Sequence, residues 1–232
     1  DAVELEGNYW TQCVRISDGS LKCWGHDASN NFGNGKGGNN NYVNTPVTAG
    51  ATGVSNFDMG HYATCTVQSG SIKCMGMSSS YYFGNGDDLV AKNSLVPVSV
   101  SGISNATDIV AGGNHNCAII SGGTVKCWGE NAYGNLGDNT TTLRTTPVTV
   151  SGLSGVSELS AAYSVTCARL SDGTVKCWGS ASSGKLGNGD DTTDRHTPVS
   201  VSGLTRVTQI SSANSQSCAI VSGNAVKCWG YN

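Results

Sequence analysis

Ten cysteines are the residues of this chain whose type and spacing could most readily do chemistry. They form five pairs, nine or ten residues apart: Cys13 and Cys23, Cys65 and Cys74, Cys117 and Cys127, Cys167 and Cys177, Cys218 and Cys228. Such pairs can form disulfides, or their thiolates can bind a metal. Structural zinc sites favour cysteines two to four residues apart, often with histidines, and that pattern is absent here. The spacing therefore favours five disulfides and an oxidising compartment.

Each cysteine pair brackets a predicted β-hairpin, because apolar and polar residues alternate on both sides of a Ser/Asp/Gly turn. In the first copy the loop is Ser17-Asp18-Gly19, and counting outward from it places Cys13 opposite Cys23. The second copy is one residue shorter, but its two-residue loop Ser69-Gly70 keeps Cys65 opposite Cys74. We therefore expect every pair to be a cross-strand staple that contributes roughly 2–3 kcal/mol through loop closure.

The hairpins recur every 50 to 52 residues, and the segments between them repeat as well. Each period holds a Pro-Val segment, an apolar strand before the first cysteine and the two hairpin strands. A repeated four-stranded unit of about fifty residues predicts an all-β fold, a β-propeller of about five blades in one domain, residues 1–232. With each repeat begun at its Pro-Val segment, the repeats are about 1–44, 45–95, 96–145, 146–196 and 197–232. This division makes the first blade the incomplete one. Three arrangements are then open: a five-bladed ring closed by packing alone, a fragment of a larger propeller, or an open end completed by a neighbouring chain.

Residues 127–138, Cys-Trp-Gly-Glu-Asn-Ala-Tyr-Gly-Asn-Leu-Gly-Asp, followed by Thr146-Pro147-Val148, carry a family resemblance. This pattern resembles the regulator of chromosome condensation (RCC1) repeat, over essentially the whole chain, and the third and fourth copies are the most similar. Met75 departs from it by replacing the tryptophan. The resemblance implies a propeller that works mostly through protein surfaces. The cysteine-bracketed hairpins resemble the secreted bacterial branch of the family.

Composition limits the other classes of function. The chain has 232 residues, 13 Lys and Arg, 16 Asp and Glu and a formal charge of -3, and its basic residues are scattered. We therefore expect no nucleic-acid binding. No run of 18 apolar residues occurs, so we expect no membrane span. Asp1, without a preceding methionine or apolar signal, suggests a processed terminus or a boundary. The expected location is extracellular, either secreted or attached to a surface.

No catalytic motif stands out. A nucleophile elbow, a His-Glu-X-X-His helix and a phosphate-binding loop are all missing from the sequence. The four histidines show no metal-ligand spacing, so we expect no catalytic residue, no metal site and no cofactor. Calcium at two acidic loops is the open alternative, with oxygen ligands from Asp87-Asp88 or from Asp190, Asp191 and Asp194.

The residues just before the first cysteine of each pair vary most between copies. Equivalent loops of a propeller gather on one face around its axis, where ligands usually bind. The predicted binding rim there consists of Tyr9, Trp10, His61, Tyr62, His115 and Tyr163, although His115 is also suited to a hydrogen bond within its blade. A second candidate is the loop after Trp-Gly, with His26, Asp27, Tyr81, Tyr82 and Tyr133.

These residues predict a non-catalytic binding module that recognises a protein or a glycan. Two alternatives are a subunit of an extracellular polymer that assembles by strand addition at the incomplete blade, and an enzyme, such as a lyase or glycan hydrolase, at the channel mouth. Asn105 and Asn139 begin N-glycosylation sequons, which matter only in a glycosylating source.

Overall fold

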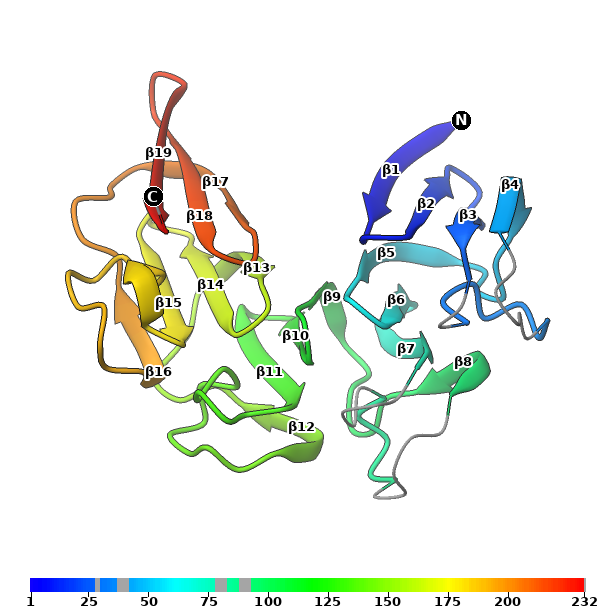
Figure 1. The fold of residues 1–232 in the computed structure, drawn as a ribbon, viewed down its shortest axis with the longest axis horizontal. Helices are drawn as coiled ribbons and strands as arrows, with labels where there is room; N and C mark the ends of the chain where they lie inside the picture. The colour runs from blue at the N-terminus through cyan, green and yellow to red at the C-terminus, as the bar shows by residue number, and fades with distance from the viewer. Residues whose placement is uncertain (28–29, 37–41, 78–82, 88–92, 232) are drawn as a thin grey trace.

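A computed structural model describes residues 1–27, 30–36, 42–77, 83–87 and 93–231. In this part of the chain the strands form five antiparallel sheets, which are the five blades of a propeller (Figure 1). The prediction of an all-β propeller is confirmed. The blades follow one another in an arc around an axis, with the first and fifth blades at its two ends.

Each of the first four blades has four strands in chain order from the axis outward. The first blade contains β1 (Ala2–Gly7), β2 (Thr11–Ile16), β3 (Leu21–His26) and β4 (Tyr42–Thr48). The second contains β5 (Val54–Met59), β6 (Ala63–Gln68), β7 (Ser71–Gly76) and β8 (Ser94–Ser99). The third contains β9 (Ala106–Ala111), β10 (His115–Ile120), β11 (Thr124–Gly129) and β12 (Arg144–Thr149).

The fourth blade contains β13 (Val156–Ala161), β14 (Val165–Leu170), β15 (Val175–Gly179) and β16 (Arg195–Ser200), with a short 3-10 turn η1 (Ser182–Gly184) between its last two strands. The fifth has three strands among the described residues: β17 (Val207–Ser212), β18 (Gln216–Val221) and β19 (Ala225–Gly230).

The Pro-Val segment is the outer strand of the blade before it, not the first strand of the blade after it. Val47 pairs with Cys23 of its own blade, and Val98 pairs with Cys74. The expectation that the first blade lacks a strand is therefore wrong: β1 to β4 form a complete sheet, and the three-stranded sheet is the fifth. The reason is local, because an antiparallel return to the neighbouring edge is the shortest path after β3.

The predicted register of the hairpins is confirmed. Each first cysteine lies directly opposite its partner, and all five disulfides form. In the shortened second hairpin, Ser69 and Gly70 take φ angles of 49° and 78°. Two successive residues with positive φ make the tight turn that a two-residue hairpin loop requires. The deletion is therefore absorbed in the turn, and Cys65 stays opposite Cys74.

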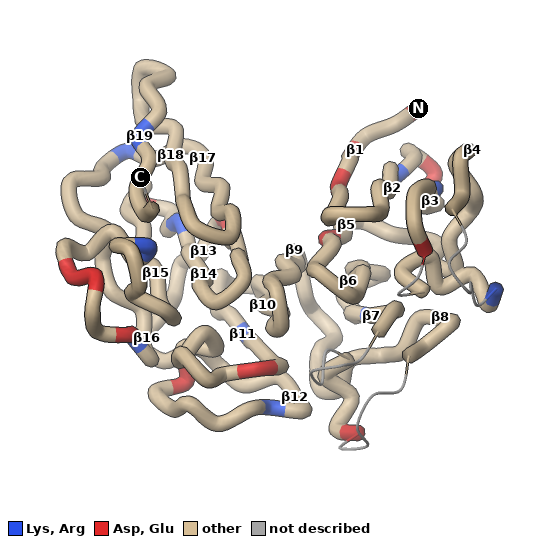
Figure 2. The backbone as a smooth tube through the Cα atoms, in the orientation of Figure 1, with Lys and Arg blue, Asp and Glu red and all other residues tan. Residues whose placement is uncertain are grey.

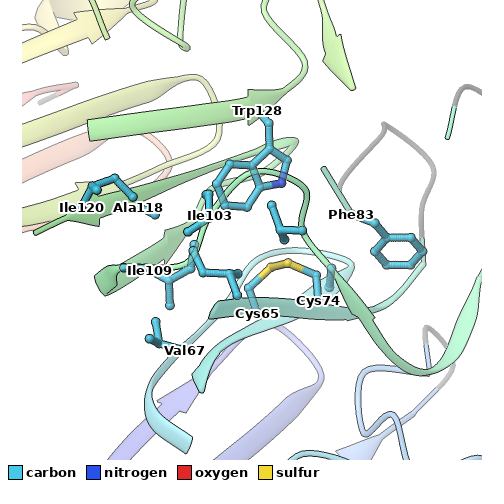
Figure 3. Close-up of a cluster of buried hydrophobic side chains, with 13 residues drawn as sticks. Cys65, Val67, Cys74, Phe83, Ile103, Ile109, Ala118, Ile120 and Trp128 are labelled. Carbon is cyan, nitrogen blue, oxygen red and sulfur yellow. A yellow bond between two sulfur atoms is a disulfide. The ribbon is translucent and has the colours of Figure 1, made fainter. Parts of the chain in front are cut away.

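The core lies between blades rather than inside each one. In the cluster shown in Figure 3, the Cys65–Cys74 disulfide of the second blade packs against Ile109 and Trp128 of the third. Both side chains are almost completely buried. Each sheet therefore depends on its neighbour for burial of its apolar face.

The two motifs of the repeat meet across this interface. Trp178 of the fourth blade covers Gly137 of the third, where an added Cβ would lie 2.8 Å from the indole nitrogen. That nitrogen donates to the backbone oxygen of Asn135 at 2.9 Å. Trp128 covers Gly84 and Trp229 covers Gly187 in the same way. The Trp-Gly of one repeat and the Leu-Gly or Phe-Gly of the preceding one thus form one contact.

The outer faces of the two end blades are exposed. Leu5 on β1 is 61% exposed, whereas Phe57, its counterpart in the second blade, is 2% exposed. At the other end, Val226 on β19 is 63% exposed. These are the two halves of an interblade contact, each without its partner among the described residues.

Candidate functional site

A cavity of about 580 Å³ opens at the axis on one face of the arc. Its wall consists of the ends of the five inner strands and the loops that join each one to the second strand of its blade. The five inner strands all run in the same direction along the axis, so the loops that follow them gather on one face of the arc. We call this opening the axial mouth.

One position of the repeat supplies the aromatic side chains that line the mouth. It is the residue four places before the first cysteine, and the five copies are Tyr9, His61, Gly113, Tyr163 and Asn214. In the first two blades the next position along the chain holds Trp10 and Tyr62, which do not line the cavity. Neighbouring residues at a strand end point in different directions, so in these two blades only one of the two faces the axis.

Tyr9, His61 and Tyr163 form an aromatic cluster in the axial mouth. The His61 ring lies 4.7 Å from the Tyr9 ring and 5.4 Å from the Tyr163 ring, centre to centre and edge to face in both pairs. Tyr9 is 63% exposed and Tyr163 is 44% exposed, so both rings offer surface to a ligand. Burial lowers the pKa of His61. The cluster is therefore an uncharged aromatic surface at neutral pH.

Hydrogen bonds tie the mouth loops together. The Asn8 side chain donates to the Gly60 oxygen of the second blade at 2.9 Å. The Asn214 side chain of the fifth blade donates to the Tyr9 hydroxyl of the first. The loops pack too closely for side chains at some positions: a Cβ on Gly60 would lie 2.6 Å from the Gly112 oxygen. The mouth is thus a fixed surface of aromatic rings, amides and bare backbone.

The other predicted rim residues lie elsewhere. Tyr62 is exposed and contacts His61 at 5.7 Å, beside the cluster. Trp10 is 67% exposed and contacts His26 at 6.0 Å, and His26 stacks on Tyr42. Trp10, His26 and Tyr42 form a separate aromatic surface on the first blade.

His115 is not part of the rim, and its expected place there is corrected. It lies two positions before Cys117 on the same strand, so both side chains face the interblade core, and His115 is completely buried. Its Nε2 lies 2.7 Å from the Thr166 hydroxyl, which donates to the Asn135 oxygen at 3.1 Å. The imidazole therefore donates from Nε2, and Nδ1 has no partner among the described residues. Burial lowers the pKa of His115 to about 4.

The axis below the mouth carries a group of carboxylates that sequence reasoning missed. A second cavity, of about 480 Å³, shares wall residues with the first and is lined by Glu4, Glu6, Asp58, Asp108 and Glu158. These residues lie seven or nine positions before the first cysteine of each pair. These two positions flank an apolar one, and this alternation in the sequence indicates that they face away from the interblade core. The carboxylate pattern is obscured because the same positions elsewhere hold Asn56, Val110, Ser160, Gln209 and Ser211.

Most of these carboxylates already have structural partners. Asp58 accepts the Ala111 amide at 2.7 Å and Glu158 accepts the Ile210 amide at 3.2 Å, each from the next blade. Glu158 also pairs with Arg169 at 2.7 Å, and Glu4 pairs with Arg15 at 2.6 Å. The axial carboxylates therefore link blades and strands.

Burial and mutual repulsion act on the same groups. Burial, with the charges of Asp58 and Glu4, raises the pKa of Glu6 to about 7. Burial likewise raises the pKa of Asp58 to about 6, although two backbone amides oppose it. The axis nevertheless keeps a negative potential at neutral pH, since the paired arginines are fewer than the carboxylates.

Where the structure describes the acidic loops, their carboxylates bond to groups of the same blade. Asp190 accepts the Thr192 amide and pairs with Arg195 at 2.9 Å, and Asp194 accepts the Ala181 amide. Within the described ranges no group of three or more His, Cys, Asp or Glu side chains could hold a metal ion. Asp88, like Tyr81 and Tyr82, lies outside the described residues. Calcium binding stays a prediction.

The remaining surface candidates are also placed. Tyr133 is 45% exposed, and Asp27 is buried and accepts the Phe32 amide. Asn105 and Asn139 are both exposed, and their glycosylation stays a prediction. No helix in the described part of the chain is long and apolar enough to cross a membrane.

Comparison with models of known protein families shows which repeats these segments resemble. Models of the Regulator of chromosome condensation (RCC1) repeat match residues 122–169 and 172–220, and a further model of the same description matches residues 106–135. These matches support the RCC1 repeat family. The matched residues hold the Leu-Gly and Trp-Gly motifs that meet between the third and fourth blades.

A curated relative is the RCC1 domain-containing protein RUG3, mitochondrial, of Arabidopsis thaliana. It is 29% identical over 129 residues, which are 53% of this chain and 29% of the relative. Among solved structures, human WBSCR16 superposes with a TM-score of 0.88 at 18% identity, over 100% of this chain and 63% of that one. Prp20p from Saccharomyces cerevisiae, described with its binding to Gsp1p and histones, gives 0.81 at 16% identity, over 99% and 58%.

These structural similarities show the fold. The chain spans under a third of the curated relative and about three fifths of the two solved structures. The RCC1-like propeller suggests a module for protein interaction.

Proposed function

We propose that this protein is a non-catalytic module, secreted or displayed on a cell surface, that binds a partner protein in its axial mouth. The observation that carries the proposal is the aromatic cluster of Tyr9, His61 and Tyr163, exposed in a cavity with a fixed wall. Tyrosines in such a place are typical anchors of protein interfaces, since each gives a large contact area at a small entropic cost. The five disulfides support the extracellular location.

A protein loop fits the mouth better than a glycan. The His61 ring meets the Tyr9 ring at 61° and the Tyr163 ring at 60°, so neither pair forms a parallel platform on which a sugar ring would lie flat. A hollow with aromatic walls instead suits a protruding side chain. The carboxylates below favour a positively charged tip on that loop. Lys and Arg are spread over several blades (Figure 2), so the proposal includes no nucleic-acid partner.

Two other functions are less well supported. Two of the axial carboxylates that an enzyme at the channel mouth could use, Asp58 and Glu158, are held by backbone amides and Arg169. A polymer built by strand addition needs a donated strand, whereas the four described Pro-Val strands are all paired. We therefore propose the binding module.

Selection from a displayed library of protein fragments tests the proposal, with a glycan array run in parallel. Binders should lose at least ~10-fold in affinity to a Tyr9→Ala/Tyr163→Ala variant, as expected for central aromatic anchors. Trp10→Ala and Tyr133→Ala, which remove exposed rings outside the mouth, should bind as the wild type does. Affinity should fall as salt screens the axial charge. Binders indifferent to the double substitution, or glycan binding alone, would contradict the proposal.

A further inference from the structure

A small pocket lies between the third and fourth blades, beside the axial mouth. Its volume is about 90 Å³, the space of roughly three water molecules, so it holds the end of one side chain and not a peptide or a sugar ring. The loops after β9, β11 and β13 form its wall, with Asn114, Glu130, Tyr133, Asn135, Tyr163 and Ser164. We call it the side pocket. Tyr163 also lines the axial mouth, so the two cavities are neighbours.

Both sides of the side pocket are held in place by interblade or backbone contacts. The backbone oxygen of Asn135 accepts the Trp178 indole N–H at 2.9 Å and the Thr166 hydroxyl at 3.1 Å, both from the next blade. On the opposite side the Tyr163 ring lies against Gly113, where an added Cβ would be 2.5 Å from a ring carbon. The pocket is therefore preformed.

The hydrogen-bonding groups of the wall leave acceptors for a ligand. The Asn114 side-chain amide donates to Glu130 Oε2, and the Asn135 side-chain amide donates to the Glu130 backbone oxygen, each at 2.6 Å. Asn135 is 3% exposed, and its Oδ1 has no hydrogen-bond partner among the described residues. The ion pairs of the described residues do not include Glu130. Buried acceptors need a donor, so this wall suits a positively charged donor group.

Two exposed aromatic rings complete the wall. Tyr133 is 45% exposed and Tyr163 is 44% exposed. The face of an aromatic ring is electron-rich and attracts a cation, and a planar guanidinium can stack on it. The guanidinium also presents a fork of N–H donors that matches a carboxylate, whereas an ammonium is a point charge. The rings together with Glu130 therefore favour arginine over lysine.

The repeat itself does not require these residue types. Trp178 rests on Gly137 between the third and fourth blades, and Trp229 rests on Gly187 between the fourth and fifth. The two junctions share this contact, but the second lacks the carboxylate, both rings and the buried amide, since Ser180, Ser183, Lys185 and Asn214 stand at the corresponding positions. A lysine there repels a cation. The chemistry of the side pocket is therefore not a by-product of interblade packing.

We propose that the side pocket binds the side chain of an arginine on a partner protein. Its guanidinium pairs with the Glu130 carboxylate, lies against the rings of Tyr133 and Tyr163, and supplies the donor that Asn135 Oδ1 lacks. The site is separate from the axial mouth, because its carboxylate belongs to the loop after β11 and not to an inner strand. A ligand held by the mouth alone thus does not depend on Tyr133, and either proposal can fail without the other.

The peptide acetyl-Gly-Arg-Gly-amide tests the proposal with the 232-residue protein. In an NMR titration the backbone amide signals of Glu130, Tyr133 and Ser164 should shift to saturation, with a dissociation constant on the order of 1 mM for one side chain. The same peptide with citrulline, which has a similar shape but no charge, should bind at least ~10-fold more weakly. The lysine peptide should bind about 3-fold or more weakly than the arginine peptide.

Three variants of the protein separate charge from aromatic contact. Glu130→Gln keeps an oxygen for the Asn114 amide but removes the charge, and should weaken the arginine peptide at least ~10-fold. Tyr133→Ala should weaken it about 3-fold or more, whereas Tyr133→Phe, which keeps the ring, should bind as the wild type does. Asp191→Asn removes an exposed carboxylate outside the pocket and is the matched control, expected to change nothing.

Four results would overturn the proposal: no saturable shift at Glu130, equal binding of the arginine and citrulline peptides, equal losses for Glu130→Gln and Asp191→Asn, or shifts confined to the axial strands around Asp58 and Asp108. The last would place the arginine on the axial carboxylates. If Glu130→Gln does not fold, the arginine and citrulline peptides decide the question with the wild-type protein.

Discussion

The side-chain amide of Asn214 donates a hydrogen bond to the hydroxyl of Tyr9, although 205 residues separate them in the chain. Both occupy the same position of the repeat, four residues before a first cysteine. The contact therefore joins the first and fifth blades at the axial mouth, while the sheet faces at the two ends of the arc, marked by Leu5 and Val226, are exposed. The position of the repeat that lines the mouth therefore also links the two ends of the arc.

Breaking this contact should loosen the arc without unfolding it. For Tyr9→Phe or Asn214→Ala we expect a larger radius of gyration by small-angle X-ray scattering. The free energy of unfolding should fall by about 1 kcal/mol or less, because the hydrogen bond is exposed. Tyr133→Phe removes an exposed hydroxyl elsewhere and serves as the control. Scattering profiles identical to the wild type would show that the bond does not hold the ends.

The contact between Trp178 and Gly137 predicts a large difference between two glycine substitutions. Gly137 and Gly152 have similar positive φ angles, 67° and 64°, but a Cβ at Gly137 would meet Trp178 whereas a Cβ at Gly152 meets nothing within 4 Å. Gly152→Ala should cost about 1 kcal/mol from backbone strain alone. Gly137→Ala should cost about 1–3 kcal/mol more from overpacking, measured by urea unfolding. Equal losses would remove the tryptophan contact from this explanation.

The disulfides should differ in their response to reductant. Eight of the ten cysteines are completely buried, whereas Cys218 is partly exposed and Cys228 is exposed. A thiolate must reach a sulfur to exchange with it, so we expect the Cys218–Cys228 bond to be reduced first under native conditions. Alkylation and peptide mass spectrometry after brief treatment with dithiothreitol measure the order. Loss of the Cys117–Cys127 bond at the same rate would contradict it.

Buried His115 should make the fold sensitive to acid. Its pKa is about 4 in the folded state, against an ordinary 6.5, so between these values the unfolded chain binds more protons. Stability should therefore be complete above about pH 6.5 and fall towards pH 4, by on the order of 3 kcal/mol.

The raised pKa values of Glu6 and Asp58 act in the opposite direction over this range, so a difference measurement is needed. The free energy of unfolding of the wild type minus that of His115→Gln should decrease from pH 7 to pH 4.5 in urea titrations. A difference that does not change with pH would mean that His115 is not the titrating group.

The sequence predicted the hairpin register because a deletion tested it: only a cross-strand pairing keeps Cys65 opposite Cys74 when one residue is lost. Assignment of the Pro-Val strand failed because a repeat has a period but no beginning, so that segment could be joined to either neighbour. The pairing of Val47 with Cys23, which decides it, is a long-range contact.

The mouth was only partly predictable for a similar reason. Strand alternation could have placed His115 in the core, because it shares the parity of Cys117, as buried Thr11 and Val165 share that of their cysteines. Which of Tyr9 and Trp10 faces the axis depends on the loop geometry at the strand end, and the residue types do not reveal it. The axial carboxylates were missed because their positions recur in every repeat but hold a carboxylate in only some copies.

Because Trp128, Trp178 and Trp229 each rest on a glycine of the preceding blade, the unit that carries stability is offset from the sheet: it begins in one blade and ends in the next. A period of about fifty residues duplicated within the chain would bring a glycine for the blade that follows and a tryptophan for the blade before. Arcs of this kind can therefore lengthen or shorten by whole periods in evolution without any new interface having to arise.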